Sequence, residues 1–274
     1  MIDLSRVLIT GGKSMISSSI RFGIKMPLEE LDVTKSEEIN EICNKINPSA
    51  IIALSSLDLR LCEDNPFEAY KVNVLGIYNL ALEAKKRDIP LVMISTGAIF
   101  NGNLNDIFKE EDLPCPQNIY GQTKYLAEII VKNILTKYLI LRTGWIYGAT
   151  NSSRLNFIDK MITSAKNNEE IQATTDQVGS PTYILDFAKE LEELLKTEKT
   201  GTYHLVNKGK ASAHEIAKHI IKTLNSKSKL NSIQVSDLPK KIKRSASEAL
   251  ESDFMNLRNW QAALEDYLST LQIK

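Results

Sequence analysis

The chain has 274 residues, of which 43% are hydrophobic and 25% charged, which is an ordinary globular composition. Lys plus Arg and Asp plus Glu balance at 34 each, so the sequence lacks the charge typical of nucleic-acid or anionic-membrane binding. No apolar run reaches the roughly 20 residues of a membrane helix, and the charged N-terminal segment is unlike a signal peptide. We expect a cytoplasmic protein that has no nucleic-acid or membrane partner and binds a small molecule.

The cysteines and histidines predict neither a disulfide framework nor a metal site. The cysteines are scattered, and no CxxC pair occurs, while the histidines lack the spacing of metal ligands. These residues are Cys43, Cys62, Cys115, His204, His214 and His219. We expect them to be structural or surface residues, with no bound metal.

Short apolar runs alternate with helical patterns in the first half of the chain. Strands are predicted at Arg6–Thr10, Ala50–Leu54, Leu91–Ser95 and Tyr138–Arg142, and helices at Lys35–Ile46, Phe67–Asp88 and Ile119–Lys137. Thr34 and Glu37 form a predicted capping box before the first helix. This alternation is typical of a parallel sheet with helices on both faces, so we predict a Rossmann-type, doubly wound α/β fold.

The pattern is less regular after about residue 144. Helices are predicted near Leu155–Asn167, Leu185–Lys196 and Met255–Gln272, a strand at Gly201–Val206, and a further helix capped by Ser212 and Glu215. We expect residues 1–143, with a return segment at about 181–200, to form the sheet domain. Residues 144–180 and 201–274 are expected to form a smaller lobe at the carboxyl edge of the sheet, where sites lie in such folds.

A glycine turn follows the first predicted strand. Gly11 and Gly12 precede Ser14 and Ser17, in the place where a turn that opens a helix can bind a dinucleotide pyrophosphate. Taken alone, such a turn is equally compatible with a structural role.

Tyr120 and Lys124 are four residues apart and therefore share one helix face. An ammonium near a phenol favours the phenolate and lowers its pKa, and the hydroxyl of Thr96 lies at a strand end. Together these groups suit proton delivery to a carbonyl that receives a hydride. The spacing also occurs by chance on helix surfaces.

Several segments in chain order resemble the extended short-chain dehydrogenase/reductases, and among them the dTDP-4-dehydrorhamnose reductase group. They are TGGKSMISSS, LDVT, PSAIIALSS, CEDNPFEAYKVNVLGIYNLA, STGAIFNG, YGQTKYLAE, RTGWIYG, DQVGSPTY and GTYHLVNKG. KRSASEALE is a weaker match to the group's Arg-Pro-x-Asn-Ser-x-Leu-Asp element. The resemblance covers nearly the whole chain and implies a reductase of a keto sugar nucleotide that uses NADPH, or NADH, and it is compatible with a homodimer.

The resemblance also implies roles for individual residues. It implies a catalytic role for Thr96, Tyr120 and Lys124, and substrate contacts for Thr96, Trp145 and Arg244. Cofactor contacts are implied for Gly11, Ser14, Met15, Ile16, Ser55, Ser56, Tyr120 and Lys124. Trp145 is equally compatible with core packing, and Asn73 is expected to brace the sheet near the site.

Three departures from the family pattern stand out. Ser14 and Ser17 replace glycines of the turn, where a side chain could crowd the pyrophosphate or donate to it. The stretch from Gly11 to Leu31 is short, so most of the second strand and its ribose-binding acid should be missing, which leaves Arg21 or Lys25 to favour a 2′-phosphate. Gly97 and Ala98 replace an Asp-Tyr pair.

The departures leave two alternatives to a reductase open. One is a non-catalytic binding or regulatory subunit with the same fold, as in the regulatory subunit of methionine adenosyltransferase. The other is a nucleotide-sugar epimerase or dehydratase, against which Gly97 and Ala98 argue because dehydratases usually carry Asp-Glu there.

Overall fold

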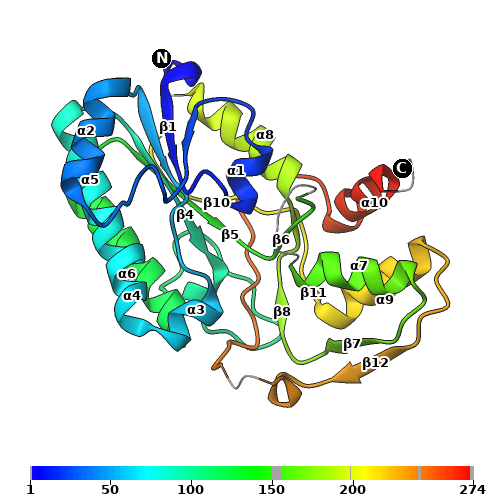
Figure 1. Ribbon diagram of the computed structural model, residues 1–274. Coiled ribbons are helices and arrows are strands. Elements are labelled where there is room, and N and C mark those ends of the chain that lie inside the picture. Colours follow the sequence, from blue (N-terminus) through cyan, green and yellow to red (C-terminus); the bar gives the residue numbers. More distant parts are fainter. Residues whose placement is uncertain (1, 150–155, 198, 240–241, 272–274) are drawn as a thin grey trace.

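A six-stranded parallel sheet forms the centre of the molecule (Figure 1). The computed structural model describes residues 2–149, 156–197, 199–239 and 242–271. In spatial order the strands are β2 (Ile24–Met26), β1 (Val7–Thr10), β3 (Ala50–Ala53), β4 (Leu91–Thr96), β5 (Tyr138–Thr143) and β10 (Gly201–His204). Every neighbouring pair is parallel. The predicted Rossmann-type α/β fold is thereby confirmed.

Helices cover both faces of this sheet. On one face lie α2 (Ser36–Ile46), α5 (Gly76–Arg87) and α6 (Ile119–Ile134), and on the other α1 (Met15–Ser19) and α8 (Ile184–Leu195) (Figure 1). Side chains alternate between the faces along β1, so Leu8 packs with the first group while Val7 and Ile9 pack with α8. Because both faces are buried, the central strands are apolar throughout.

A smaller group of elements lies beside the carboxyl edge of the sheet. It comprises α7 (Phe157–Lys166), α9 (Ala213–Thr223), α10 (Trp260–Thr270) and three pairs of short strands. The pairs are β6 (Ile146–Tyr147) with β9 (Thr182–Tyr183), β7 (Ile171–Thr174) with β12 (Leu230–Ile233), and β8 (Val178–Gly179) with β11 (Ala211–Ser212). Its core includes three aromatic rings, those of Tyr147, Tyr183 and Tyr267, with centroids 5.5 to 5.8 Å apart.

The remaining helical segments are short. They are α3 (Leu59–Asp64), α4 (Pro66–Tyr70) and a π-helical turn at Lys71–Leu75 that joins α4 to α5, with short 3₁₀ turns at Leu4–Arg6, Gly97–Ile99 and Val235–Asp237. Turns of the π type frequently accompany functional sites.

The structure differs from the sequence-based expectations in several boundaries. Strand β10 pairs with β5 as an edge of the main sheet, so the sheet continues beyond residue 200, and the division of the chain into two domains stays a prediction. The capping box at Thr34 is wrong: α2 begins at Ser36, and the Thr34 hydroxyl donates to Asp32. The capping box at Ser212 is confirmed. Leu155 and Gln272, predicted ends of two helices, lie outside the described residues.

The second strand is short but present. Met26 pairs with Thr10 at the end of β1, and Pro27 follows at once, which ends the strand because proline cannot donate to the ladder. The sheet order changes direction between β1 and β3, since β2 lies on one side of β1 and β3 on the other. Ligands bind at such a switch point, beside the carboxyl ends of the strands.

Within the described ranges, no helix is long and apolar enough to cross a membrane. Among the same residues, no cluster of three or more His, Cys, Asp or Glu side chains could hold a metal ion. The three cysteines are free, and burial raises the pKa of Cys43 and of Cys62 to about 11, which leaves both thiols unreactive at neutral pH.

Candidate active site

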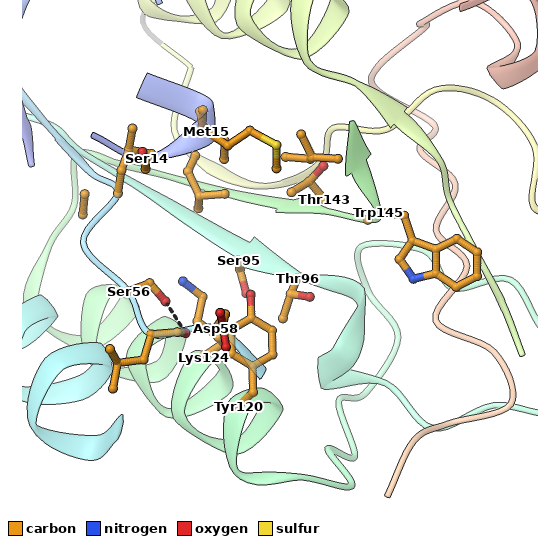
Figure 2. Close-up of a pocket in the computed structure, with 17 residues that line it drawn as sticks. Ser14, Met15, Ser56, Asp58, Ser95, Thr96, Tyr120, Lys124, Thr143 and Trp145 are labelled. Atoms are coloured by element: carbon orange, nitrogen blue, oxygen red, sulfur yellow. Dashed lines mark hydrogen bonds between the residues drawn. The ribbon is translucent and has the colours of Figure 1, made fainter. Parts of the chain in front are cut away.

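Three connected cavities lie along the carboxyl edge of the sheet. The central cavity, of about 330 Å³, is lined by Ser14, Met15, Ile16, Ser56, Ser95, Thr96, Tyr120, Lys124, Thr143 and Trp145 among others (Figure 2). The lobe cavity, of about 730 Å³, opens toward the smaller lobe and adds Lys13, Phe157, Arg244 and Glu248. The turn cavity, of about 250 Å³, adds Gly11, Glu29, Asp32 and Ser55. The residues for which the resemblance implies catalytic, cofactor or substrate contacts therefore each line one of these cavities.

The glycine turn brings the ends of β1 and β3 into close contact. Gly11 has φ +62, and a Cβ on it would lie 2.8 Å from the backbone of Leu54 and Ser55. The Thr10 hydroxyl accepts hydrogen bonds from the N–H groups of the same two residues at 3.2 Å. Only glycine fits this position, which explains why the turn keeps its first glycine.

Ser14 occupies its position without backbone strain. Its φ of −68 is ordinary for a residue with a side chain, and its hydroxyl accepts a hydrogen bond from the Ser17 N–H as the N-cap of α1. The same side chain lines all three cavities. Replacement of the family's second glycine by serine is thus accommodated by a cap, and among the described residues the Ser14 hydroxyl donates to no acceptor, so it can donate toward a ligand.

Gly121 allows helix α6 to pack closely against the end of β4. A Cβ there would lie 2.3 Å from the Ala98 carbonyl oxygen, so glycine permits the close approach. Asn118 caps the helix by accepting from the Gly121 N–H at 2.8 Å. This packing places Tyr120, in the first turn of α6, beside Thr96 at the end of β4.

Figure 2 shows the side chains of Tyr120 and Thr96 pointing into the central cavity. The Thr96 hydroxyl accepts from the Ala98 N–H at 3.1 Å, which fixes its rotamer. Burial raises the pKa of Tyr120 to about 12, and the nearby Thr96 hydroxyl lowers it only in part. The phenol therefore keeps its proton at neutral pH and can donate it.

Lys124 lies one turn further along α6 and is 6% exposed. Burial lowers the pKa of Lys124 to about 8, while the carboxylate of Glu128, a further turn along, acts in the opposite direction. The expected lowering of the Tyr120 pKa by this ammonium is wrong for the free protein. The pKa of Tyr120 is raised instead, chiefly by desolvation of the phenol, and the nearby negative groups of Glu248 and Asp58 raise it further.

Asn73, expected to brace the sheet near the site, braces the loop after β3. Its side-chain oxygen accepts from the Leu57 N–H at 2.8 Å, and its amide nitrogen donates to the Thr123 hydroxyl at 3.0 Å. The residue is 1% exposed and lies in the π-helical turn. It ties this loop to α6, the helix that carries Tyr120 and Lys124.

Two buried hydroxyls in the central cavity have no hydrogen-bond partner among the described residues, those of Ser95 and Thr143. Both lie at carboxyl ends of adjacent strands, β4 and β5. An unpartnered buried hydroxyl costs free energy unless a ligand or water satisfies it. The polar edge of a nicotinamide ring fits this pair, and the close-packed Gly11 turn fits a pyrophosphate, so the cavities suit a dinucleotide.

Trp145 separates the central and lobe cavities and lines both. Its ring meets Phe157 edge to face at 5.2 Å and lies over Gly179, where a Cβ would come within 2.5 Å of the indole. The indole lies near Glu248 and lowers the pKa of that carboxyl. Trp145 is therefore both a packing residue and a wall of the site.

Arg21 and Lys25, which the sequence suggested as contacts for a 2′-phosphate, do not line any of the three cavities. Arg21 lines a separate surface pocket with α8 residues, and Lys25 donates to the Ile20 carbonyl at 2.6 Å. Helix α1 has only five residues, so the chain turns toward α8 before reaching Arg21. The cation at the turn cavity is Lys13, which pairs with Glu29 at 2.8 Å.

Sequence reasoning missed several lining residues. Ser95 and Thr143 could have been found from the rule that strand ends meet at one edge, because each lies near the end of a predicted strand. Glu248 and Lys13 had no such signal, since only the folded chain brings them to the cavities.

The chain matches the family model described as "RmlD substrate binding domain" over residues 5–273. It is 28% identical over 97% of both chains to the spore coat polysaccharide biosynthesis protein SpsK of Bacillus subtilis (strain 168). It is 29% identical to the dTDP-4-dehydrorhamnose reductase of Aggregatibacter actinomycetemcomitans, covering 96% of this chain and 98% of the relative.

Solved structures are similar over the same extent. The dTDP-4-dehydrorhamnose reductase of Bacillus anthracis str. Ames in complex with NADP has a TM-score of 0.90 at 29% identity, covering 96% of this chain and 98% of that one. The UDP-glucose 4-epimerase of Thermotoga maritima has a TM-score of 0.79 at 16% identity, a likeness of fold alone.

Proposed function

Because the chain belongs to the family of the RmlD substrate binding domain, we propose that it is an NADPH-dependent reductase of a keto sugar nucleotide, with dTDP-4-dehydrorhamnose as the candidate substrate. The observation that carries this function is the placement of Thr96, the protonated Tyr120 and the buried Lys124 on the wall of one cavity. Such a reductase serves deoxysugar or polysaccharide synthesis, as the name of the Bacillus subtilis relative indicates for that protein.

Tyr120 is the proton donor in this proposal. The substrate keto oxygen accepts hydrogen bonds from Thr96 and Tyr120, and the phenol proton passes to that oxygen as the carbonyl carbon is reduced. When bound, the dinucleotide supplies the hydride that the carbon receives. The phenolate that remains is stabilised by the Lys124 ammonium, and a proton from solvent restores the phenol.

The cofactor side of the site uses backbone and hydroxyl groups. We assign the pyrophosphate to the turn at Gly11, with Ser14, Met15 and Ile16 at the start of α1. The hydroxyls of Ser95 and Thr143 suit the carboxamide of a nicotinamide, and Ser55 and Ser56 lie where the chain leaves β3, between the central and turn cavities.

The sugar nucleotide is assigned to the lobe cavity. Its walls combine the indole of Trp145, the ring of Phe157 and the guanidinium of Arg244, which suits a sugar ring with an attached diphosphate. The cavity meets the central cavity at Tyr120, so a keto group on the sugar can reach the proton donor.

A coupled measurement tests the function. Purified protein should consume NADPH, followed by its absorbance, only when dTDP-4-dehydrorhamnose is added, and the product should be dTDP-rhamnose by mass spectrometry. Binding of NADPH without turnover of this compound would indicate that another keto sugar nucleotide is the substrate. Binding of a nucleotide sugar without NADPH binding would favour the non-catalytic subunit.

We further propose a cytoplasmic enzyme that forms a homodimer. Exposed apolar side chains gather on two adjacent helices, including Tyr78 and Leu82 on α5 and Leu126 and Ile129 on α6. A face of this kind suits a second copy of the chain. Analytical ultracentrifugation of wild type and Leu126→Glu would test it, and a monomeric wild type would contradict it.

A further inference from the structure

Glu248 lies on an extended segment, Ser245–Glu251, that crosses between the smaller lobe and the sheet domain. Its backbone N–H donates to the Val178 carbonyl at 2.9 Å, and the adjacent residue, Ser247, forms isolated β-bridges with Gly102 and Val178. The Gln177 amide donates to the Glu248 carboxylate at 3.4 Å. The backbone of Glu248 is thus held from both sides, which fixes where its side chain starts.

The Glu248 carboxyl lines the lobe cavity together with Tyr120, Trp145 and Arg244. It lies near the indole of Trp145, which lowers the pKa of the carboxyl, and its charge contributes to raising the pKa of Tyr120. The carboxyl therefore shares one cavity with the reacting phenol. Burial raises the pKa of Glu248 to about 7 although the guanidinium of Arg244 acts against this, so about half of the molecules carry a carboxylate at pH 7.

Arg244 does not occupy all the acceptor sites of the Glu248 carboxylate. The buried Nε of Arg244 has no hydrogen-bond partner in the part of the chain that the structure describes. An ionised carboxylate offers about four acceptor sites, and the Gln177 amide supplies one donor. Both an acceptor and a donor therefore remain available at the lobe cavity for a ligand.

The lack of a side chain at Gly97 explains why the carboxyl group on this wall of the lobe cavity comes from Glu248 and not from position 97. In the family pattern an aspartate follows the threonine, but here a Cβ at position 97 would lie 2.4 Å from the Glu248 carbonyl oxygen. No side chain fits at Gly97 while the segment keeps this path. The short side chain of Ala98, which also lines the lobe cavity, leaves room for the longer glutamate from the other wall.

We propose that Glu248 determines sugar specificity by accepting a hydrogen bond from a ring hydroxyl of the substrate, which holds the keto group toward Tyr120. The inference rests on the proposed function, since it needs a sugar nucleotide in the lobe cavity. A buried acceptor built for a hydroxyl discriminates strongly against a sugar that lacks it, because the carboxylate is then left unpaired. Glu248 is a positioning and specificity residue, and the proton still comes from Tyr120.

The test distinguishes contacts with the sugar from contacts with the nucleotide. Calorimetric titration of dTDP-rhamnose and of dTDP should show that Glu248→Ala weakens binding of dTDP-rhamnose by about tenfold, equivalent to about 1.4 kcal/mol. Binding of dTDP should change less than about twofold. Glu248→Gln, which keeps the shape and one acceptor, should lose about threefold and serves if the alanine variant does not fold.

Glu251→Gln is the matched control, because Glu251 lies on the same segment but is exposed and does not line the cavity. It should bind both ligands like wild type. Equal losses for dTDP and dTDP-rhamnose in the Glu248 variants, or no loss for either, would overturn the inference while leaving the reductase function standing. Failure of wild type to bind either ligand would overturn this inference together with the proposed substrate.

Discussion

The Arg142 guanidinium donates to the Glu128 carboxylate at 2.8 Å, and the two side chains are only 2% and 0% exposed. Glu128 lies on α6 one turn after Lys124, and Arg142 lies on β5, so the pair fixes the active-site helix to the sheet. Arg142 also donates to the Glu110 carbonyl at 3.1 Å and contacts His204 on β10. The ion pair thus connects the catalytic helix to two strands and a loop.

Removing one partner of this pair should destabilise the protein strongly. Glu128→Gln leaves the Arg142 charge buried without its counter-ion, which typically costs about 3–5 kcal/mol. The free energy of unfolding, measured by urea titration, should fall by that amount. Glu193→Gln breaks an ion pair with Lys196 whose side chains are 55% and 45% exposed, and should change stability by less than about 1 kcal/mol. Similar losses in both variants would contradict the role of burial.

Tyr120→Phe should lower kcat by about two to four orders of magnitude, the usual range for loss of a general acid. The ring is kept, so the affinity for NADPH should change little. Tyr125→Phe is the matched control: it lies on the same helix but lines none of the three cavities. Steady-state rates and fluorescence titration measure the two quantities. A near-normal rate for Tyr120→Phe would show that another group donates the proton.

The residues that we propose for catalysis could be placed on one cavity from the sequence because their motif is local, whereas much of the cavity wall could not be predicted. Tyr120 and Lys124 lie four residues apart on one helix, and Thr96 ends a strand whose apolar run is plain in the sequence. The spacing could not give their pKa values, because those depend on burial by groups from other elements. Glu248 lies more than a hundred residues beyond Tyr120 and reaches the cavity only through the path of its segment.

The errors near the N-terminus have a common physical cause. Both Arg21 and Lys25 are close to the glycine turn in sequence, but a five-residue helix rotates the chain toward α8 before either is reached. The length of α1 depends on its packing, which a sequence pattern does not contain. Likewise Thr34 looked like an N-cap, but its hydroxyl bonds to Asp32 two residues earlier and the helix starts later.

The affinity for NADPH should fall as the pH rises through about 8. Burial lowers the pKa of Lys124 to about 8 from 10.5, so the free enzyme loses an ammonium for which the family resemblance implies a contact with the cofactor. Tyr120, with a pKa of about 12, keeps its proton in this range. Fluorescence titration one pH unit below and above this value should show weaker binding at the higher pH.

The stability contribution of the same residue has the opposite sign. Between about pH 8 and pH 10.5 the unfolded chain binds the Lys124 proton and the folded chain does not, so the free energy of unfolding rises with pH. Loss of binding therefore does not reflect unfolding. Lys124→Met should bind NADPH weakly at every pH with no such inflection, and an inflection that persists in this variant would assign it to another group.

The choice between NADPH and NADH should depend on Lys13. It lines the turn cavity, and its ion pair with Glu29 is exposed, with side chains 73% and 65% accessible, so the pair contributes little free energy and a phosphate can compete for the lysine. A charge-assisted contact to a 2′-phosphate accounts for about tenfold in affinity. Lys13→Met should therefore weaken NADPH by about tenfold and NADH by less than about twofold.

Glu29→Gln provides the reciprocal test of that assignment. Removing the carboxylate frees Lys13 and takes a negative charge away from the cavity rim, so NADPH should bind about threefold more tightly while NADH is unaffected. Lys25→Met is the matched control, because its ammonium donates to the Ile20 carbonyl, and it should leave both affinities unchanged. Equal loss of both cofactors in Lys13→Met would place the lysine at the pyrophosphate. Weaker binding of NADPH alone in Lys25→Met would show that Lys25, and not Lys13, contacts the 2′-phosphate.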